Sequence, residues 1–423
     1  MGNVNLFSSK KAFRRASPRY SENKLSYSSG SYDGDRQGVF SFRTVILASI
    51  VLFVGFVAFR MVTMEVDVNL VMTYQVPEGV SLESVGNALS NNQWAAAVDG
   101  RVVASGVNTK VQPTASTTKM ILALAIMEKK PFEKDSDGET ITITQEMYDR
   151  YAWYIANNGS NTKVTIGEEI LERDALISVM LASSNNMADS LAIWAFGSIE
   201  EYQKYATEML SRFGVSNTTL GAKDASGYDE STTSTPEDLA KIAYYVLKNP
   251  VLAEIVGLKT ATVPVAGEIP NTNKLLGQSG IVGVKTGYIG EPSGYCIVSG
   301  YLEGEHIITV SMLGSASRER SFNGNLAVVE DLQEVLKPAL LISKGEEVGY
   351  YESWWTGKVP ITSTSDFSEI NYHNASISAE ILVNALEIKI NNNTYKVELN
   401  VPDFSRKPNL IQRFLHIFGW EVR

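Results

Sequence analysis

One apolar run limits what this chain can fold into more than any other feature. Residues 44–64 are almost all Val, Ile, Leu, Phe, Ala, Gly or Met, and only Thr44, Ser49, Arg60 and Thr63 interrupt them. As an α-helix these positions would extend roughly 30 Å, which is the thickness of the hydrocarbon core of a bilayer. The run therefore predicts one transmembrane helix.

Charge is distributed unequally on the two sides of this run. Residues 1–43 carry eight basic and three acidic residues, a net charge of +5, whereas the whole chain has a net charge of −10. Because cytoplasmic flanks of membrane helices are enriched in Lys and Arg, we predict a cytoplasmic tail at 1–43 and an exported remainder. A cleaved signal peptide has a shorter apolar core that ends in small residues, but this run ends in Phe59-Arg60-Met61. We therefore expect an uncleaved anchor at residues 44–64.

Composition excludes several classes of function. The single cysteine excludes an internal disulfide framework, and three histidines far apart in sequence leave little for a zinc site. The acidic net charge argues against a general nucleic-acid binder. With 423 residues, 44% hydrophobic and 20% charged, the chain has room for two to three ordinary globular units. We expect neither a metal nor a cofactor.

The exported part divides by pattern into a connector at residues 65–88, an enzyme-sized domain at 89–340, a β-rich domain at 345–402 and a tail at 403–423. The larger domain has outer strands around a central helical block, which favours an α+β or α/β architecture. Its expected hairpins join 94–98 to 101–105 and 294–302 to 306–313, and its expected helices are 116–129, one or two within 171–194, and 236–247. The expected N-caps are Ser116 or a neighbour for the first of these helices and Thr235 for the last. The tail is amphipathic over 408–420, so we expect it either to lie on the membrane surface or to pack on protein.

A serine followed by a lysine carries the chemistry that we expect. A serine hydroxyl is a poor nucleophile without a base, and the only histidine of the larger domain, His306, falls on an expected strand beside a turn. Ser116 and Lys119 are three positions apart at the start of an apolar helix, so their side chains share one face. A lysine that burial keeps neutral can act as the base. Ser-x-x-Lys also occurs at 8–11, 21–24 and 160–163, but none of these opens an apolar helix.

Two further motifs follow in order and make the first one informative. Ser183-Ser184-Asn185 comes between helical segments, and Lys285-Thr286-Gly287 follows it. Because Asn186 also follows Asn185, both Ser183/Asn185 and Ser184/Asn186 fit the pattern Ser-x-Asn, and the flanking residues favour the first register.

Ser-x-x-Lys, Ser-x-Asn and Lys-Thr-Gly in this order are the signature of penicillin-binding proteins and serine β-lactamases. From about Trp94 to Phe322 the sequence resembles the low-molecular-mass D-alanyl-D-alanine carboxypeptidases. The resemblance implies an α+β transpeptidase fold, in which an antiparallel sheet combines with a helical subdomain, followed by a small all-β domain. It also implies a bacterial membrane protein that acts on peptidoglycan stem peptides outside the cytoplasm and is inhibited covalently by β-lactams.

The resemblance assigns a role to each motif residue. Ser116 would attack the peptide carbonyl, Lys119 would be its base, and Ser183 would relay a proton to the leaving amine. The expected substrate-binding residues are Asn185, Lys285, Thr286, Gly287, Tyr288 and Arg320. Among them, Thr286 and Arg320 would hold the terminal carboxylate, and the backbone N–H groups of Ser116 and Tyr288 would form the oxyanion hole.

Three alternatives remain open at this point. A class A β-lactamase would carry a Glu-x-x-Leu-Asn loop after the second motif, and none occurs between Asn186 and Lys285. A D,D-endopeptidase would use the same residues on cross-linked peptides. A non-catalytic scaffold that binds the cell wall would have no chemical reason to keep Ser116 and both lysines.

Overall fold

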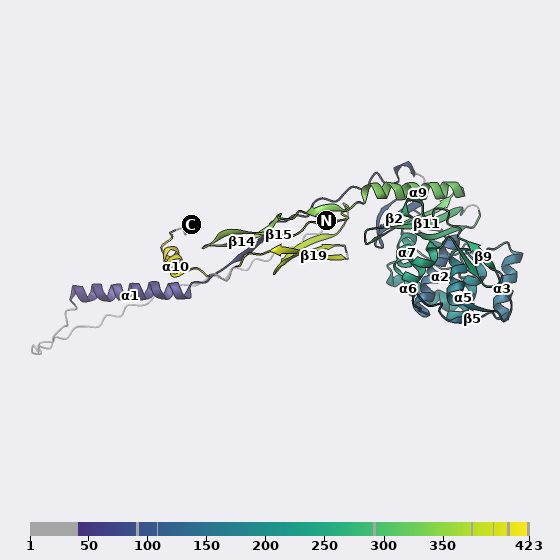
Figure 1. Ribbon diagram of the computed structural model, residues 1–423, viewed down its shortest axis with the longest axis horizontal. Helices are drawn as coiled ribbons and strands as arrows, with labels where there is room; N and C mark the ends of the chain where they lie inside the picture. The colour runs from purple at the N-terminus through teal and green to yellow at the C-terminus, as the bar shows by residue number, and fades with distance from the viewer. Residues whose placement is uncertain are drawn as a thin grey trace, which may run out of the picture. The chain divides into compact units, whose positions relative to one another are not determined.

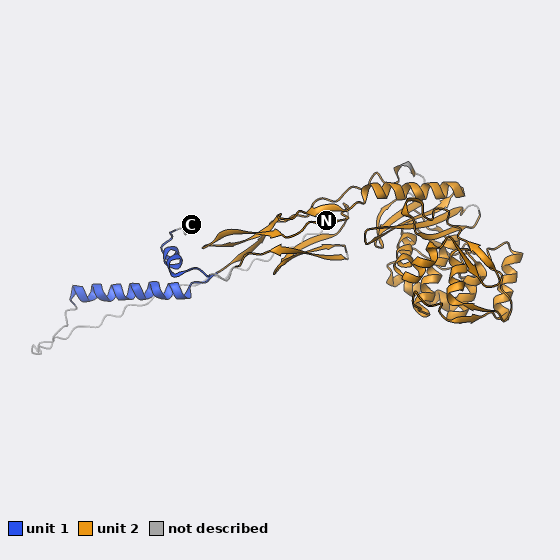
Figure 2. Cartoon of the chain, viewed as in Figure 1, with its two compact units in different colours: residues 1–66, 407–423 blue, residues 67–406 orange. Residues whose placement is uncertain are grey.

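The computed structural model describes residues 41–89, 93–107, 109–290, 293–373, 375–391, 393–403 and 407–420. They form two compact units, one from the described residues of 1–66 and 407–423, and one from 67–406 (Figure 2). The basic tail expected at 1–43 lies almost entirely outside the described residues.

The smaller unit contains the predicted apolar helix. α1 (Phe42–Thr63) is long and apolar enough to cross a membrane, and nearly all of its side chains are exposed within the unit. Soluble proteins bury such a surface, so its exposure fits a lipid environment. The predicted apolar helix is therefore present, and its crossing of a membrane stays a prediction.

A second helix, α10 (Leu410–Ile417), packs against α1. The Arg413 guanidinium donates a hydrogen bond of 2.7 Å to the Met61 carbonyl, and the ring of Phe418 lies 6.3 Å from that of Phe53. Of the two places expected for the amphipathic tail, the structure shows packing on protein, although Leu410 and other apolar side chains of the tail remain exposed.

The larger unit is built around an antiparallel sheet in the order β10-β11-β12-β2-β3 (Figure 1). Its strands are β2 (Gln93–Val98), β3 (Arg101–Ser105), β10 (Gly283–Tyr288), β11 (Tyr295–Glu303) and β12 (His306–Ser315). Both predicted hairpins are present, β2 with β3 and β11 with β12. Asp99 and Gly100 join β2 to β3 and have φ values of 49° and 78°, as a two-residue hairpin turn requires.

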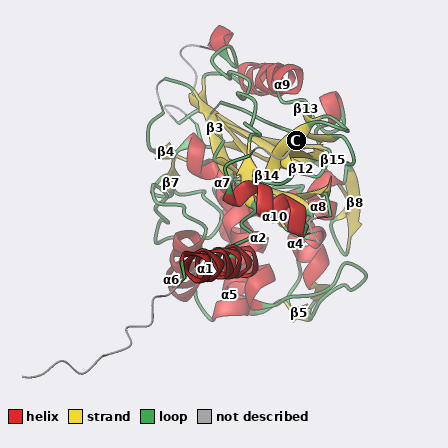
Figure 3. Cartoon of the chain, turned by 90° about the vertical axis from the view of Figure 1, so that its left-hand side faces the viewer, coloured by secondary structure: helices red, strands yellow, loops and turns green. Residues whose placement is uncertain are grey.

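Helices cover both faces of this sheet (Figure 3). α9 (Arg318–Val335) packs on one face, where Ile297 belongs to its core, and α7 (Pro236–Lys248) packs on the other face, where Val298 belongs to the core of the helical block. Alternate residues of β11 thus enter opposite cores. The helical block also contains α2 (Lys119–Lys129), α3 (Gln145–Ala156), α4 (Glu172–Met180), α5 (Asn185–Phe196), α6 (Ile199–Arg212) and α8 (Pro250–Gly257). Short strands complete it: β4 (Gln112–Pro113), β5 (Thr140–Thr142), β6 (Glu169–Leu171), β7 (Thr233–Ser234), β8 (Thr260–Val263) and β9 (Gly267–Pro270).

The structure confirms the predicted cap at Thr235, whereas the side chains of Ser116 and of its neighbours Thr114 and Thr118 cap no helix. The Thr235 hydroxyl accepts a hydrogen bond from the Asp238 N–H at the start of α7. Ser116 caps no helix, because a 3₁₀ turn (Ala115–Thr118) precedes α2 and the Ser116 hydroxyl faces Lys119 instead.

A β-rich part follows α9, as predicted. Its strands are β13 (Ala339–Ile342), β14 (Glu347–Ser353), β15 (Gly357–Ser363), β16 (Phe367–Glu369), β17 (Ile377–Leu382), β18 (Ala385–Ile390) and β19 (Asn393–Asn400). The segment expected to be a connector contributes β1 (Asn69–Met72), which pairs with β14 at the edge of a six-stranded sheet. Residues on both sides of the catalytic sequence therefore build one sheet.

A partly buried histidine joins this β-rich part to the catalytic sheet. His306, at the start of β12, places Nδ1 2.7 Å from an Asp99 carboxylate oxygen and Nε2 2.6 Å from a Glu369 carboxylate oxygen. Hydrogen bonds to Asp99 and Glu369 raise the pKa of His306 to about 10. Both nitrogens donate only in the imidazolium form, so the neutral-pH protein holds a carboxylate–imidazolium–carboxylate clamp here.

We predict that His306→Gln destabilises this junction in a pH-dependent way. The raised pKa stabilises the folded wild type fully below pH 6.5, and this contribution disappears as the pH rises toward 10. The difference in free energy of unfolding should be about 2 kcal/mol at pH 6 and should shrink at higher pH. Thermal unfolding of the full chain in detergent, followed by circular dichroism from pH 6 to 10, measures it. Parallel stability curves for the two proteins would contradict the clamp.

Candidate active site

A cleft of about 620 Å³ brings most of the sequence-predicted residues together. Its walls come from the 3₁₀ turn before α2, the start of α5, the loops around residues 159 and 228, strand β10 and the start of α9. The predicted residues that line it are Ser116, Ser183, Asn185, Thr286, Gly287 and Tyr288. Motifs separated by up to 172 positions in sequence (116 to 288) thus meet in one cavity.

Lys119 is the buried centre of this site. Its Nζ lies 2.8 Å from the Ser116 hydroxyl, 2.7 Å from Asn185 Oδ1 and 2.9 Å from the Ser226 carbonyl oxygen. The last two groups only accept hydrogen bonds. A neutral Lys119 amine therefore donates its two N–H bonds to them and turns its lone pair toward the Ser116 hydroxyl. This is the geometry that a general base for Ser116 needs.

Burial sets the protonation of both lysines. Lys119 is completely buried, and desolvation lowers its pKa to about 7, although the charges of Asp224 and Asp189 oppose this decrease. Lys285 is 1% exposed, and burial together with the charge of Lys119 holds its pKa well below the usual range. Its Nζ donates to the Thr286 carbonyl and lies behind the wall of the cleft.

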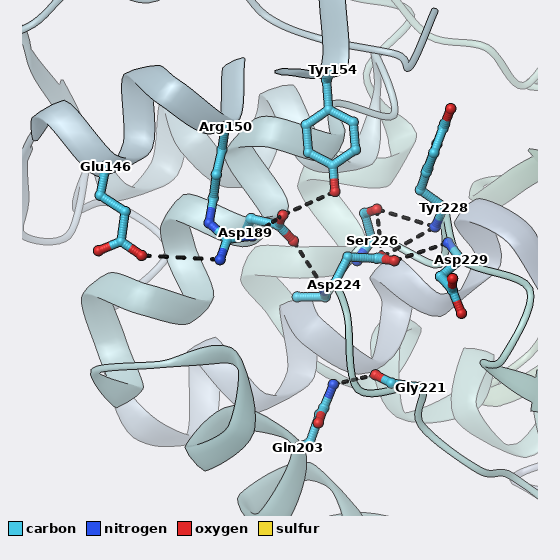
Figure 4. Close-up of polar contacts among 11 residues, drawn as sticks. Glu146, Arg150, Tyr154, Asp189, Gln203, Gly221, Asp224, Ser226, Tyr228 and Asp229 are labelled. Carbon is cyan, nitrogen blue, oxygen red and sulfur yellow. Dashed lines mark hydrogen bonds and ion pairs between the residues drawn. The ribbon is translucent and has the colours of Figure 1, made fainter. Parts of the chain in front are cut away.

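A second layer of carboxylates positions the carbonyl that Lys119 contacts. The Asp224 carboxylate accepts hydrogen bonds from the N–H and hydroxyl of Ser226, each at 2.7 Å, and from the N–H groups of Tyr228 and Asp229 (Figure 4). These bonds fold residues 224–229 into a tight loop. Gly227 has φ of +72°, and a Cβ there would lie 2.2 Å from the Ala115 carbonyl oxygen, so this close approach requires glycine.

Asp189 of α5 also holds the loop of residues 224–229 in place. Its carboxylate accepts hydrogen bonds from the Ala225 N–H (2.8 Å), the Arg150 guanidinium (2.8 Å) and the Tyr154 hydroxyl (2.9 Å). Burial raises the pKa of Asp189 to about 6. The sequence reasoning missed Asp189, Asp224 and Ser226. The only sign of these residues in the sequence is the turn at Ser226-Gly227, which follows Asp224 closely.

The two serines of the middle motif occupy different environments. Ser183 lines the cleft, and its φ of 59° is a strained value for a residue other than glycine. Ser184 is fully buried and donates to Asn186 Oδ1 (2.8 Å), which also accepts from the Thr162 N–H (2.9 Å). Ser184 and Asn186 thus tie α5 to a neighbouring loop, whereas Ser183 and Asn185 face the cleft.

Strand β10 forms the wall opposite α5. A Cβ on Gly287 would lie 3.0 Å from the Ser116 backbone nitrogen, so glycine lets the strand approach Ser116 closely. The Thr286 hydroxyl donates to the Thr272 hydroxyl at 2.8 Å. Tyr288 is half exposed, and its ring stacks on Tyr295 at 4.2 Å.

The arginine that reaches the cleft differs from the one expected. Arg318, at the start of α9, lines the cleft, and its guanidinium lies 5.9 Å from the ring centre of Tyr295. Arg320 is exposed on the same turn and does not line the cleft. The two positions are two residues apart on a helix and therefore point in different directions.

The cleft also contains a loop that the sequence reasoning treated as a solvated stretch. Asn158, Gly159 and Ser160 line it, and the Ser160 carbonyl accepts a hydrogen bond of 2.8 Å from the Asn185 N–H. The Ser-x-x-Lys sequence at 160–163 therefore contributes backbone to the wall.

The fold and this cleft define a serine enzyme of the penicillin-binding class, in which a buried lysine activates the nucleophile. The family model described as D-alanyl-D-alanine carboxypeptidase matches residues 94–316, more than half of the sequence. The chain belongs to this family of serine peptidases. The predicted family, the α+β transpeptidase fold and the enzyme class are confirmed.

Individual relatives agree with the family match. The chain is similar to a D-alanyl-D-alanine carboxypeptidase of Streptomyces sp. strain K15, with 29% identity over 246 residues that cover 52% of this chain and 82% of the relative. A D-alanyl-D-alanine endopeptidase of Haemophilus influenzae is 31% identical over 204 residues, 47% of this chain and 65% of the relative.

Solved structures show the same fold. A point mutant of the Streptomyces K15 DD-transpeptidase superposes with a TM-score of 0.51 and 25% identity, covering 57% of this chain and 97% of the other. A D-alanyl-D-alanine carboxypeptidase of Mycobacterium tuberculosis gives a TM-score of 0.50 at 24% identity, covering 62% of this chain and 94% of the other, and shows the fold alone.

We predict a pH profile set by Lys119. Acylation of Ser116 by a labelled penicillin should slow tenfold per pH unit below about pH 7, because the protonated amine cannot accept a proton. Asp224→Asn removes a charge that raises the pKa of Lys119, so the acid limb should move to lower pH. The rate of labelling between pH 5 and 9 measures this shift.

Asp135→Asn, which removes an exposed charge that does not line the cleft, is the matched control for Asp224→Asn. It should leave the acid limb in place. An acid limb that stays unmoved in Asp224→Asn as well would show that Asp224 does not act on Lys119.

Proposed function

We propose that this chain is a membrane-anchored carboxypeptidase that removes the terminal D-alanine of peptidoglycan stem peptides through an acyl-enzyme on Ser116. The buried Lys119 amine beside the Ser116 hydroxyl is the observation that carries the proposal. Membership of the family supports the substrate class. The cleft, open to solvent, can admit a peptide end.

The reaction proceeds in two transfers. Lys119 takes the Ser116 proton as Oγ attacks the carbonyl between the two D-alanines, and the backbone N–H groups of Ser116 and Tyr288 stabilise the oxyanion. The C–N bond then breaks, and the proton on Lys119 passes through Ser183 to the leaving amine. Water attacks the acyl-enzyme, Lys119 takes its proton, and Ser116 regains a proton as the shortened peptide leaves.

The remaining cleft residues bind the substrate. Asn185 holds the peptide amide, and the β10 backbone at Gly287 runs beside it. Lys285 supports this wall of the cleft from behind, because its Nζ donates to the Thr286 carbonyl. For the terminal carboxylate we assign Arg318 together with Thr286, since Arg318 lines the cleft and Arg320 does not.

Topology follows from the anchor. Residues 1–43 are basic and α1 is long enough to span, so we assign the tail to the cytoplasm and the catalytic part to the outside of a bacterial cell membrane. β-Lactams should acylate Ser116, because they present a strained carbonyl to the same nucleophile.

A D,D-endopeptidase is the second candidate, because relatives from Haemophilus influenzae and Pseudomonas aeruginosa carry that name. Both activities use one acyl-enzyme and differ in the leaving group. A cross-linked peptide dimer leaves an amine that is still attached to a second stem, whereas carboxypeptidase action releases free D-alanine.

We predict that the full chain in detergent releases D-alanine from a peptide ending in D-Ala-D-Ala, and that Ser116→Ala lowers the rate by at least about 10³-fold. The measurement is free D-alanine, followed by an amino-acid oxidase, with a cross-linked dimer assayed in parallel. Ser184→Ala keeps the cleft residues and serves as the control. Undiminished release by Ser116→Ala would disprove the assigned nucleophile. Cleavage of the dimer alone would establish the endopeptidase.

Arg318→Ala should raise KM about tenfold or more, because it removes a charge-assisted hydrogen bond to the terminal carboxylate. Arg320→Ala, two positions away on the same helix, is the matched control and should change KM little. The loss in Arg318→Ala should vanish for a substrate whose terminal carboxylate is amidated. A larger increase in KM for Arg320→Ala than for Arg318→Ala would show that Arg320, the arginine expected from the sequence, binds the terminal carboxylate.

A further inference from the structure

The hairpin of β14 and β15 extends beyond the other strands of the β-rich part (Figure 1). Thr362 of β15 pairs with Asn400, where β19 ends, and the five residues 357–361 continue from there to the hairpin turn. At about 3.3 Å per residue, the hairpin extends roughly 17 Å past the end of β19. β1 lies along this extension, because Asn69 pairs with Glu352 near the turn.

The core-side face of the hairpin loses its cover toward the turn. Opposite residues of antiparallel strands share a face, so Met72, Gly349 and Ile361 form one row on this face. The row meets the core, since Ile361 is fully buried and a Cβ on Gly349 would lie 2.8 Å from Ile381 Cδ1. Met72 and Leu70, on the same face of the edge strand β1, are nevertheless 42% and 43% exposed.

More apolar side chains gather at this end of the sheet. Trp354 and Trp355 form the hairpin turn with ring centres 5.4 Å apart, and Trp354 is partly exposed. The turn between β17 and β18 lies at the end of β19, because the Asn384 carbonyl accepts a hydrogen bond from the Leu399 N–H, and Val383 in this turn is 86% exposed. We name these residues together the apolar end: Leu70, Met72, Trp354, Leu382 and Val383. Such a patch marks an interaction surface.

The length of the chain indicates what covers the apolar end. α1 ends at Thr63 and β1 begins at Asn69, so only residues 64–68 link them. This linker spans at most about 20 Å when fully extended. If α1 crosses a bilayer, β1 therefore begins close to the headgroup layer, which is roughly 5–8 Å thick on each side. The hairpin turn lies beyond Asn69 on the side from which the linker arrives, because Trp354 follows Glu352, the partner of Asn69.

The charges near the turn exclude attraction to anionic lipid as the source of a membrane contact. Residues 64–72 and 350–360 contain the acids Glu65, Asp67 and Glu352 but only one base, Lys358. Anionic lipids attract basic segments, and this one is acidic. Tryptophan, by contrast, favours the headgroup level of a bilayer through its amphipathic ring. A neutral membrane surface therefore fits the apolar end.

We propose that the apolar end inserts into the headgroup region of the membrane that α1 spans, as a second membrane contact of the exported part. This inference rests on the proposed anchoring by α1. Insertion removes the exposed side chains of Leu70, Met72 and Val383 from water, which stabilises the contact. The contact limits how freely the exported part swings on residues 64–68, and it needs no anionic lipid.

The test uses the full chain in phosphatidylcholine vesicles, a fluorophore on one introduced cysteine, and lipids with a nitroxide quencher at headgroup depth. Thr356→Cys places the label in the hairpin turn, and Thr394→Cys, another exposed threonine near the start of β19, is the matched control. The native Cys296 is buried, and the unsubstituted chain gives the background. Quenching should be at least about threefold stronger at 356 than at 394, because roughly 35 Å of strand separates the two positions, far more than the headgroup layer.

Charged substitutions test the apolar end itself. Leu70→Glu combined with Val383→Glu should lower the quenching at 356 to the level found at 394, because carboxylates resist insertion. Ser378→Glu combined with Thr394→Glu introduces the same charges at exposed positions away from the apolar end and should leave the quenching at 356 unchanged. Covalent labelling by a fluorescent penicillin shows that each variant is folded.

A label at Ser49→Cys in α1, with a quencher on the lipid acyl chain, tests the anchor separately. Quenching at 49 and 356 but not at 394, with its loss at 356 in the double Glu variant alone, supports the proposal. Quenching at 49 with equally weak quenching at 356 and 394 overturns the second contact and leaves the anchor intact. Energy transfer between labels at 356 without quenching by lipid also overturns it, and shows that a second copy covers the apolar end. Absence of quenching at 49 overturns the anchor, and the second contact with it.

Discussion

The burial of Lys119 is the physical constraint on which the rest of the site depends. An amine removed from water favours its neutral form, and here the pKa decreases to about 7. Neutrality alone would not make a base, because the lone pair could point anywhere. The two carbonyl acceptors, Asn185 Oδ1 and the Ser226 oxygen, take the N–H bonds and leave the lone pair to Ser116. Burial therefore sets the protonation state of the Lys119 amine, and the two acceptors set the direction of its lone pair.

The two hydrogen-bond acceptors of Lys119 come from segments that are far apart in sequence, so the fold has to hold both segments in place. Asn185 begins α5, and Ser226 sits in a loop that Asp224 folds and Asp189 supports. Backbone strain collects at the same place, since Ala115 and Ser183 both have positive φ values. The close-packed sheet and helical block hold this strain, because the neighbouring segments cannot relax without losing buried contacts.

The sequence predicted that Ser116 and Lys119 lie together because their relation is local. A spacing of three residues at a helix start determines which side chains share a face, and an apolar helix predicts burial. The hairpin at Asp99-Gly100 and the Thr235 cap were predictable for the same reason. The expectation that Ser116 or a neighbour caps the helix was wrong, because the preference of serine for N-caps does not show whether its hydroxyl caps a helix or faces a lysine from a 3₁₀ turn.

Residues whose role depends on the tertiary fold were not predictable. Asp224 is 108 positions from Ser116, and the residues next to it in sequence do not indicate that its loop contacts Lys119. The difference between Arg318 and Arg320 depends on the direction in which the first turn of α9 leaves the sheet. The same holds for β1, which precedes the catalytic part in sequence but pairs with β14, which follows it. The sheet of the β-rich part thus includes strands from both sides of the catalytic sequence, and His306 ties that part to the catalytic sheet. Local sequence thus encodes the pairing of Ser116 with Lys119, and the long-range fold encodes the burial and the hydrogen bonds around that pair.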